Sequence, residues 1–225
     1  EQTGAILNMW FPGQEGGYAT ADLLLGLANP GGKLPVTFPQ RESDLATYGK
    51  PEMYPGVNNQ EYYSETIYVG YRWFDKEGLD PLFPFGHGLS YAEFEYSNLS
   101  VVPHYDGYDV TFTVKNTGAV TGTEVPQVYL GKASAALNTL SPQSVASIPH
   151  EKKLAGFQRI ELAPRQSQQV TIHVGARELS SWSTIVHDWV RDPGTPAVYV
   201  GSSSRDLRLM TTPILAYTYL PLVTK

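Results

Sequence analysis

From residue 94 onward, short segments that alternate apolar and polar residues follow one another along the chain. The alternation is clear at residues 96–101, 108–114, 124–130, 154–162, 169–174 and 197–200. Turn-forming residues separate the segments at 116–118, 163–164 and 192–194. About seven short alternating strands with regular turns are typical of an immunoglobulin-like β-sandwich, because one face of each strand enters a common core. We therefore predict an all-β sandwich over residues 92–217, in which the Ser-, Ala- and Pro-rich residues 133–149 form an inserted loop.

The first 40 residues have a different pattern, that of an α/β layer. Residues 4–11 are a mostly apolar run, residues 14–25 have a helical composition, and residues 34–39 form a short extended segment. Strand, helix and strand in this order indicate an α/β fold. A strand buried on both faces belongs to a parallel sheet and needs neighbouring strands. We interpret residues 1–40 as the C-terminal piece of a larger α/β domain, separated at Glu1 by a proteolytic nick or expressed as a separate subunit.

Residues 41–91 are irregular and rich in Tyr, Pro and Gly. Within them, only residues 67–74 have clear strand character. A segment of this length without regular structure is usually functional or packed between domains. We expect residues 41–91 to be a connector that wraps across a larger protein, and residues 218–225 to be a tail beyond the sandwich.

The composition excludes several classes of function. The net charge is −6 and the pI is near 5.3, which argues against nucleic acid as a partner. The chain has no run of 18 apolar residues and no cysteine, so we predict no membrane span, no disulfide and no thiolate metal site. We also predict no metal site and no cofactor, because metal-ligand spacing is absent among the five histidines, His87, His104, His150, His173 and His187.

Several strings of residues resemble those of glycoside hydrolase family 3 and occur in that family's order. The N-terminal strings are WFPGQEGG at 10–17, ADLLLG at 21–26, NPGGKLPVTFP at 29–39, YVGYRWFD at 68–75 and PLFPFGHGLSY at 81–91. The strings that resemble the family's fibronectin-III-like domain are VKNTG at 114–118, EVPQVYL at 124–130, KLAGF at 153–157 and VGSSS at 200–204. One string would be weak evidence, but collinear strings over most of the chain are specific.

The resemblance implies a retaining, exo-acting β-glycosidase of the β-glucosidase or β-xylosidase type, most simply a β-glucosidase. In that family a (β/α)8-type domain supplies an Asp nucleophile, and an α/β sandwich domain supplies a Glu acid/base from a loop upstream of the PGQE string. Retention needs two carboxyl groups about 5 Å apart. Neither motif that carries them is present here, so we predict no catalytic residue in this chain and assign no substrate-binding residue. The implied partners are the N-terminal part of the same enzyme and a β-linked glycoside, in a secreted or periplasmic setting.

Two carboxylates could be functional despite this expectation, and for each we compare a functional role with a structural one. Glu15 follows the first predicted strand, near the edge where open α/β sheets bind ligands, but its place in the first turn of a helix favours a structural role. Glu65 lies in the connector and could face a substrate cleft. An ion pair with Arg72 or Lys76 is the simpler expectation, because buried carboxylates are usually paired.

Aromatic residues offer flat apolar faces that could stack on sugar rings. For the connector cluster we favour packing in a core or interface; its members are Tyr62, Tyr63, Tyr68, Tyr71, Trp73 and Phe74. Trp10 and Phe11 are better candidates for sugar stacking, although packing is the simpler expectation there too. We expect His87, flanked by two glycines, to pack at a domain interface.

A function of a different class stays open from the sequence. The sandwich could be a stand-alone carbohydrate-binding or structural module. The strand–helix–strand pattern of residues 1–40 argues against it, because such a module needs no truncated α/β layer. Asn98 begins an Asn-Leu-Ser glycosylation sequon, which adds little to either interpretation because its occupancy depends on the host.

Overall fold

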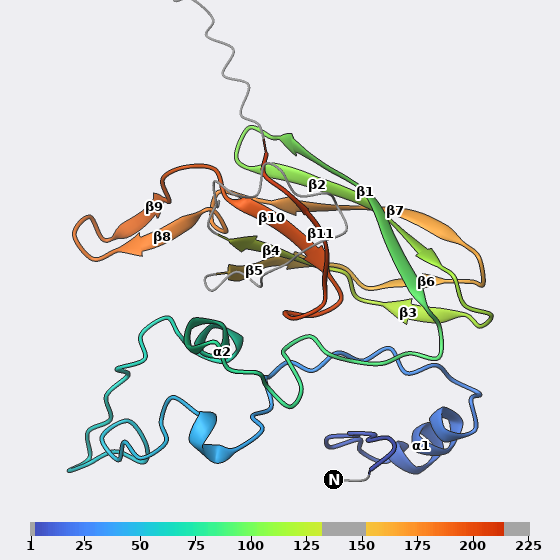
Figure 1. The fold of residues 1–225 in the computed structure, drawn as a ribbon, viewed down its shortest axis with the longest axis horizontal. Helices are drawn as coiled ribbons and strands as arrows, with labels where there is room; N and C mark the ends of the chain where they lie inside the picture. The colour runs from blue at the N-terminus through green and yellow to red at the C-terminus, as the bar shows by residue number, and fades with distance from the viewer. Residues whose placement is uncertain (1–2, 132–151, 214–225) are drawn as a thin grey trace, which may run out of the picture.

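A computed structural model describes residues 3–131 and 152–213, arranged in two layers (Figure 1). A β-sandwich forms the upper layer, and the two helices with their long connections lie below it. The expected loop at 133–149 and the tail at 218–225 lie outside the described residues. In the described part of the chain, no helix has the length and apolar character needed to cross a membrane.

The sandwich consists of two antiparallel sheets that face each other. One sheet has the order β1-β2-β7, with bounds Phe94–Pro103, Tyr108–Asn116 and Ser167–Val174. The other has the order β11-β10-β4-β5, with bounds Leu207–Thr211, Ala197–Gly201, Gln127–Gly131 and Lys152–Phe157. Two short pairs complete the domain: β3–β6 at Gly122–Glu124 and Ile160–Leu162, and β8–β9 at Ser180–Ser183 and Asp188–Arg191.

Burial explains why the sheets differ in sequence pattern. Strand β2 alternates between buried and partly exposed residues, because only one of its faces enters the core. Strands β4 and β10 are buried at every position. Val128 and Val200 face the sandwich core, whereas Tyr129 and Tyr199 belong to a second cluster into which Tyr71 of the connector packs. The connector therefore covers the outer face of the four-stranded sheet.

The predicted strands are recovered with local differences. The segment 124–130 is divided, because Pro126 between β3 and β4 has no N–H for a ladder. The segment 154–162 is divided into β5 and β6. The β8–β9 hairpin and β11 were not predicted. Every residue of β9 is exposed, so burial imposes no alternation of apolar and polar residues on it.

The first 40 residues contain the expected helix but not paired strands. Helix α1 spans Gly16–Leu24. Residues 4–10 form no strand, and residues 34–39 contribute one antiparallel bridge between Phe38 and Phe83. A strand of a parallel sheet forms only beside neighbouring strands, and the described residues supply none for this segment.

The connector contains a helix where the sequence predicted a strand. The strand expected at 67–74 is wrong, because helix α2 covers Tyr71–Glu77. Gly70 precedes it with φ 57°, and Gly78 ends it in the left-handed conformation with φ 64°. Of the aromatic residues that suggested a strand, Tyr71 packs on Tyr129 of the sandwich and Phe74 is buried. Tertiary packing here overrides β-propensity. A 3₁₀ turn, η1, spans Glu42–Asp44.

Candidate functional site

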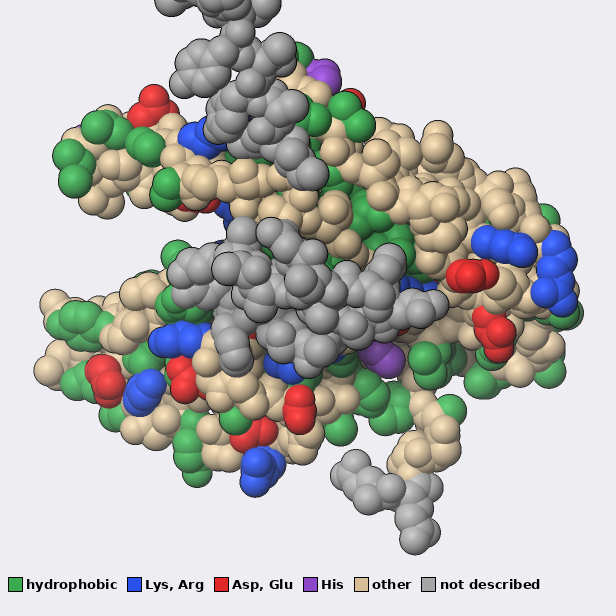
Figure 2. Space-filling model, turned by 45° about the horizontal axis from the view of Figure 1, so that its top comes forward, with side chains coloured by type: hydrophobic (Ala, Val, Ile, Leu, Met, Phe, Trp, Pro, Cys, Tyr) green, Lys and Arg blue, Asp and Glu red, His purple; other side chains and the backbone are tan. Residues whose placement is uncertain are grey.

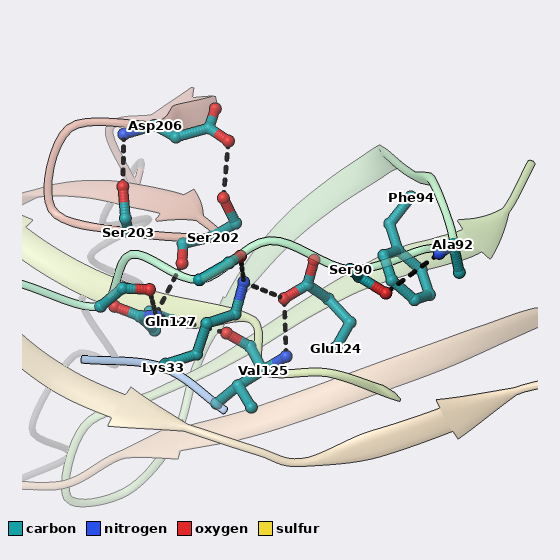
Figure 3. A network of polar contacts seen from close by, with 12 residues as sticks. Lys33, Ser90, Ala92, Phe94, Glu124, Val125, Gln127, Ser202, Ser203 and Asp206 are labelled. Carbon is teal, nitrogen blue, oxygen red and sulfur yellow. Dashed lines mark hydrogen bonds and ion pairs between the residues drawn. The ribbon is translucent and has the colours of Figure 1, made fainter. Parts of the chain in front are cut away.

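A buried ion pair ties the first 40 residues to the sandwich (Figure 3). The Lys33 ammonium lies 2.9 Å from Oε1 of Glu124 on β3, and both side chains are largely buried. Lys33 also donates a hydrogen bond to the carbonyl of Gly88 at 3.1 Å, and the same Glu124 oxygen accepts one from the N–H of Val125 at 2.7 Å. The interaction joins three segments that are far apart in sequence.

Gln127 forms the centre of the same network. Its Nε2 donates to the carbonyl of Ser202 at 2.8 Å and to that of Gly86 at 3.3 Å, while its Oε1 accepts from the Tyr129 hydroxyl at 2.5 Å. Gly86 has φ +81°, and a Cβ there would lie 2.3 Å from the Gln127 amide oxygen. This position of the connector therefore needs glycine both for its backbone angle and for its close approach to β4.

A second buried ion pair holds α2 against the sandwich. Asp75 of α2 bonds Lys152 of β5, and neither side chain is exposed to solvent. Arg205, in the turn between β10 and β11, lies 3.2 Å from the other Asp75 oxygen and donates to the carbonyl of Leu79 at 2.8 Å. Burial lowers the pKa of Lys152, and the adjacent Asp75 carboxylate opposes that shift. The connector is therefore locked to the sheet by charges as well as by apolar contacts.

His87 lies at this junction, where a packing role was expected. Its ring stacks on Phe83 at 5.5 Å between centroids, and its carbonyl accepts the N–H of Leu34 at 2.8 Å. Burial and the nearby Lys33 charge lower the pKa of His87 below 6.5, with Asp206 opposing. Burial and the Lys33 charge thus favour the neutral form of the ring where the connector meets the sandwich.

We predict that His87 makes folding stability depend on pH. Because its pKa is lower in the folded than in the unfolded chain, the unfolded chain binds the extra proton as the pH falls below 6.5. The free energy of unfolding should therefore decrease through that range, and less so in His87→Gln. Urea unfolding at several pH values measures this, with exposed His187→Gln as the control. Equal pH dependence in wild type and His87→Gln would contradict the prediction.

In contrast to this buried junction, the start of the chain exposes many large apolar side chains. Phe11 is 97% exposed and Trp10 52%. We call the set the apolar N-terminal surface; it consists of Ile6, Leu7, Trp10, Phe11, Tyr18, Leu24, Leu25 and Leu27. Hydrophobic side chains are visible along the lower edge of the molecule in Figure 2. So many exposed large apolar side chains in one short segment are typical of a site of contact with another protein segment.

Glu15 and Glu65, the two carboxylates considered from the sequence, lie apart. Glu15 is exposed at the N-cap of α1, where its side chain makes no capping hydrogen bond. Glu65 is half-buried, six residues before α2, and the two helices lie well apart in the lower layer (Figure 1). The expected ion pair of Glu65 is wrong, because the described residues include no ion pair of Glu65 with Arg72 or Lys76. Lys76 instead lies 3.6 Å from Glu77, and the buried Oε2 of Glu65 has no hydrogen-bond partner. Glu15 and Glu65 are therefore not placed to act together as the general acid and the nucleophile of a glycosidase.

The aromatic cluster is divided between packing and exposure. Tyr71 lies 5.9 Å from Tyr129, ring centre to ring centre, and the Trp73 indole donates to the carbonyl of Asp44 at 2.9 Å. Tyr62 and Tyr63 stay exposed. Packing thus accounts for Tyr71 and Trp73 on α2. Trp10 and Phe11 are exposed in this chain, so the packing expected there and its alternative, sugar stacking, both stay untested.

The structure brings together one cluster that sequence spacing did not indicate. His104, Asp106 and His173 have ligand atoms within 4.8 Å of one another. A side-chain hydrogen bond from His104 lowers the pKa of Asp106, and one to Asp109 raises the pKa of His173. His173 is distant in sequence and joins the cluster only because β7 pairs with β2. A correct prediction of the pairing between β2 and β7 would therefore have indicated this cluster.

Two family models match the chain. The glycosyl hydrolase family 3 C-terminal domain matches residues 1–91, and the fibronectin type III-like domain matches residues 124–204. Among curated proteins, the chain is 36% identical over 213 residues to thermostable beta-glucosidase B of Acetivibrio thermocellus, covering 93% of this chain and 26% of that protein. The chain spans about a quarter of the length of the curated relatives it matches.

Solved structures show the same relation. The chain superposes on DesR, a beta-glucosidase from Streptomyces venezuelae in complex with D-glucose, with a TM-score of 0.81 at 46% identity, covering 91% of this chain and 25% of that one. It also superposes on beta-glucosidase 3B from Thermotoga neapolitana in complex with glucose, with a TM-score of 0.74 at 37% identity, covering 89% and 26%. About nine-tenths of this chain therefore has the fold of the matching quarter of these two β-glucosidases.

Proposed function

Because the chain belongs to glycoside hydrolase family 3, as the end of its C-terminal domain followed by the fibronectin III-like domain, we propose that it serves a retaining, exo-acting β-glucosidase. In this proposal it completes the α/β sandwich domain and supports the active-site cleft. The catalytic Asp and Glu lie on the N-terminal part, which carries the (β/α)8-type domain. The substrate is a β-linked glucoside.

The observation that carries the proposal is the contrast between the two layers. The sandwich has a complete core, with Val110, Phe112 and Val128 fully buried. The apolar N-terminal surface remains uncovered, and three of its residues, Ile6, Leu7 and Trp10, belong to the segment that was expected to be a strand and has no partner strand among the described residues. An α/β sheet supplied by the rest of the enzyme would cover this surface and pair with residues 4–10. The sandwich and connector would then act as a rigid support.

The experiment is hydrolysis of an aryl β-glucoside by native protein captured with an antibody against this chain, compared with the isolated 225-residue chain. We expect activity in the native material, none in the isolated chain, and none on the aryl α-glucoside control. Proton NMR of the first-formed glucose should show the β anomer, as retention requires. Native material that cleaves neither glucoside would contradict the proposal.

Glu15 provides a prediction about where catalysis resides. In the whole enzyme Glu15→Gln should leave most of the activity, because this carboxylate is exposed at a helix N-cap and makes no capping bond. The kcat on an aryl β-glucoside measures the effect, and Asp22→Asn within α1 is the control. A loss of about a thousandfold, the scale of an essential acid/base, would place a catalytic group in this chain and overturn the prediction.

A further inference from the structure

A turn at the end of the sandwich farthest from the connector positions two of the clustered side chains. Residues 104–107 connect β1 to β2, and His104 and Gly107 hydrogen-bond each other's backbone at 2.9 and 3.2 Å. A Cβ at Gly107 would lie 1.9 Å from the carbonyl oxygen of Val174, so the turn sits tightly against the end of β7. His104 and Asp106 are thus held beside that strand by backbone geometry.

His173 of β7 faces both of these groups. Its Nε2 lies 3.2 Å from Oδ1 of Asp106, which is also 2.7 Å from Nδ1 of His104. The donors of a tetrahedral ion with bonds of about 2.1 Å lie about 3.4 Å apart. The separation of His173 from Asp106 is close to that value, and the partly exposed His104 ring has room to adjust. Three ligand atoms thus converge at a spacing that suits a metal ion.

A further carboxylate orients the histidine. Nδ1 of His173 lies 2.8 Å from Oδ1 of Asp109, its cross-strand partner on β2. A carboxylate that accepts the Nδ1–H of an imidazole leaves the Nε2 lone pair directed at the opposite side, which is the arrangement around histidine ligands of zinc. This contact is independent of the His104–Asp106 contact, and the ligand atoms of His104, Asp106 and His173 lie within 4.8 Å of one another.

The surroundings leave room for a fourth ligand. Gly175 borders the cluster, and a Cβ there would lie 3.3 Å from Oε2 of Glu178, 3.6 Å from Nε2 of His173 and 3.7 Å from Oδ2 of Asp106. Glu178 therefore borders the cluster but lies outside the group whose ligand atoms are within 4.8 Å of one another, so we expect water to supply the fourth ligand. Two imidazoles with carboxylates suit Zn²⁺ and related transition metals better than Mg²⁺ or Ca²⁺, which prefer oxygen ligands alone.

We propose that His104, Asp106 and His173 form a binding site for a Zn²⁺-class divalent ion, with Asp109 as the positioning residue for His173. The bound ion links the β1–β2 turn to the end of β7. Because the site lies on the far side of the sandwich from the connector, the proposal does not depend on the proposed glycosidase function (Figure 1).

Isothermal titration calorimetry of the full chain with Zn²⁺ tests the site. We expect one ion per chain, an affinity at least about tenfold lower in His104→Ala and in His173→Ala, and about tenfold lower in Asp109→Asn. His187→Ala, an exposed histidine in the β8–β9 hairpin, should bind like wild type, and Mg²⁺ should not compete.

A second readout separates the site from incidental binding by other histidines. Zn²⁺ should raise the melting temperature of wild type and of His187→Ala, because an ion that binds only the folded chain stabilises it. The shift should disappear in the double variant His104→Ala/His173→Ala, whose circular dichroism without metal should match wild type. Zn²⁺ binding of equal affinity in wild type and the double variant would overturn the proposal. So would the absence of Zn²⁺ binding to a folded wild-type chain.

Discussion

Asp75→Ala should lower the free energy of unfolding by about 3–5 kcal/mol, the range for removing one partner of a buried ion pair. The substitution leaves the Lys152 ammonium without its carboxylate partner at a position with no solvent exposure. It also removes the anion next to Arg205. The connector should then detach from the outer face of the four-stranded sheet. Urea unfolding of the full chain, followed by tryptophan fluorescence and circular dichroism, measures the change.

Asp80→Ala is the matched control for this experiment. Asp80 also lies near Arg205, at 3.5 Å, but its side chain is 88% exposed. An exposed ion pair contributes at most about 1 kcal/mol, so we expect a small effect. Asp75→Asn separates charge from shape, because it keeps the volume and removes the charge. Equal stability losses in Asp75→Ala and Asp80→Ala would show that the buried pair does not hold the layers together.

Phe112→Ala should destabilise the chain by a similar amount, about 3–5 kcal/mol, for a different reason. Phe112 is fully buried in the middle of β2, where its ring stacks on Tyr96 at 6.1 Å between centroids. Truncation removes apolar contacts and leaves a cavity between the two sheets, which the antiparallel ladders on both sides of β2 prevent from collapsing. Thermal and urea unfolding measure the loss.

Phe157→Ala provides the same chemical change at an exposed position. Phe157 ends β5 and is 65% exposed, so its replacement should change stability by no more than about 0.5 kcal/mol. A loss in Phe112→Ala no larger than that in Phe157→Ala would contradict the assignment of the core to the space between the two sheets.

The sandwich could be predicted from the sequence because its strands expose one face. Alternation in β2 and β7 reports directly which residues enter the core. Strands β4 and β10 were also predicted, within the segments 124–130 and 197–200, although burial does not alternate in them because both of their faces are covered. Strand β9 was missed, because all of its residues are exposed. Helix α2 was mistaken for a strand because its aromatic residues are β-formers by propensity, whereas the packing of Tyr71 on Tyr129 depends on tertiary structure.

The candidate sites also differ in how far the sequence alone could predict them. Glu15 could be placed at a helix start from the chain alone, because PGQE precedes an apolar run. The pairing of Asp75 with Lys152 spans 77 positions and depends on how α2 docks. The cluster of His104 and His173 depends on the register of β2 against β7. Interactions across layers and between strands follow from tertiary structure, which local patterns do not specify.

The central claim is that this chain works as the C-terminal part of a larger β-glucosidase. The most direct measurement is the mass of the native protein, with peptide mapping of everything that co-purifies with this chain. We predict a polypeptide, or a tight complex, about four times the length of this chain, consistent with its share of related enzymes. It should contain the (β/α)8-type domain and hydrolyse an aryl β-glucoside. Native protein with the 24.8 kDa mass of this chain alone would contradict the account.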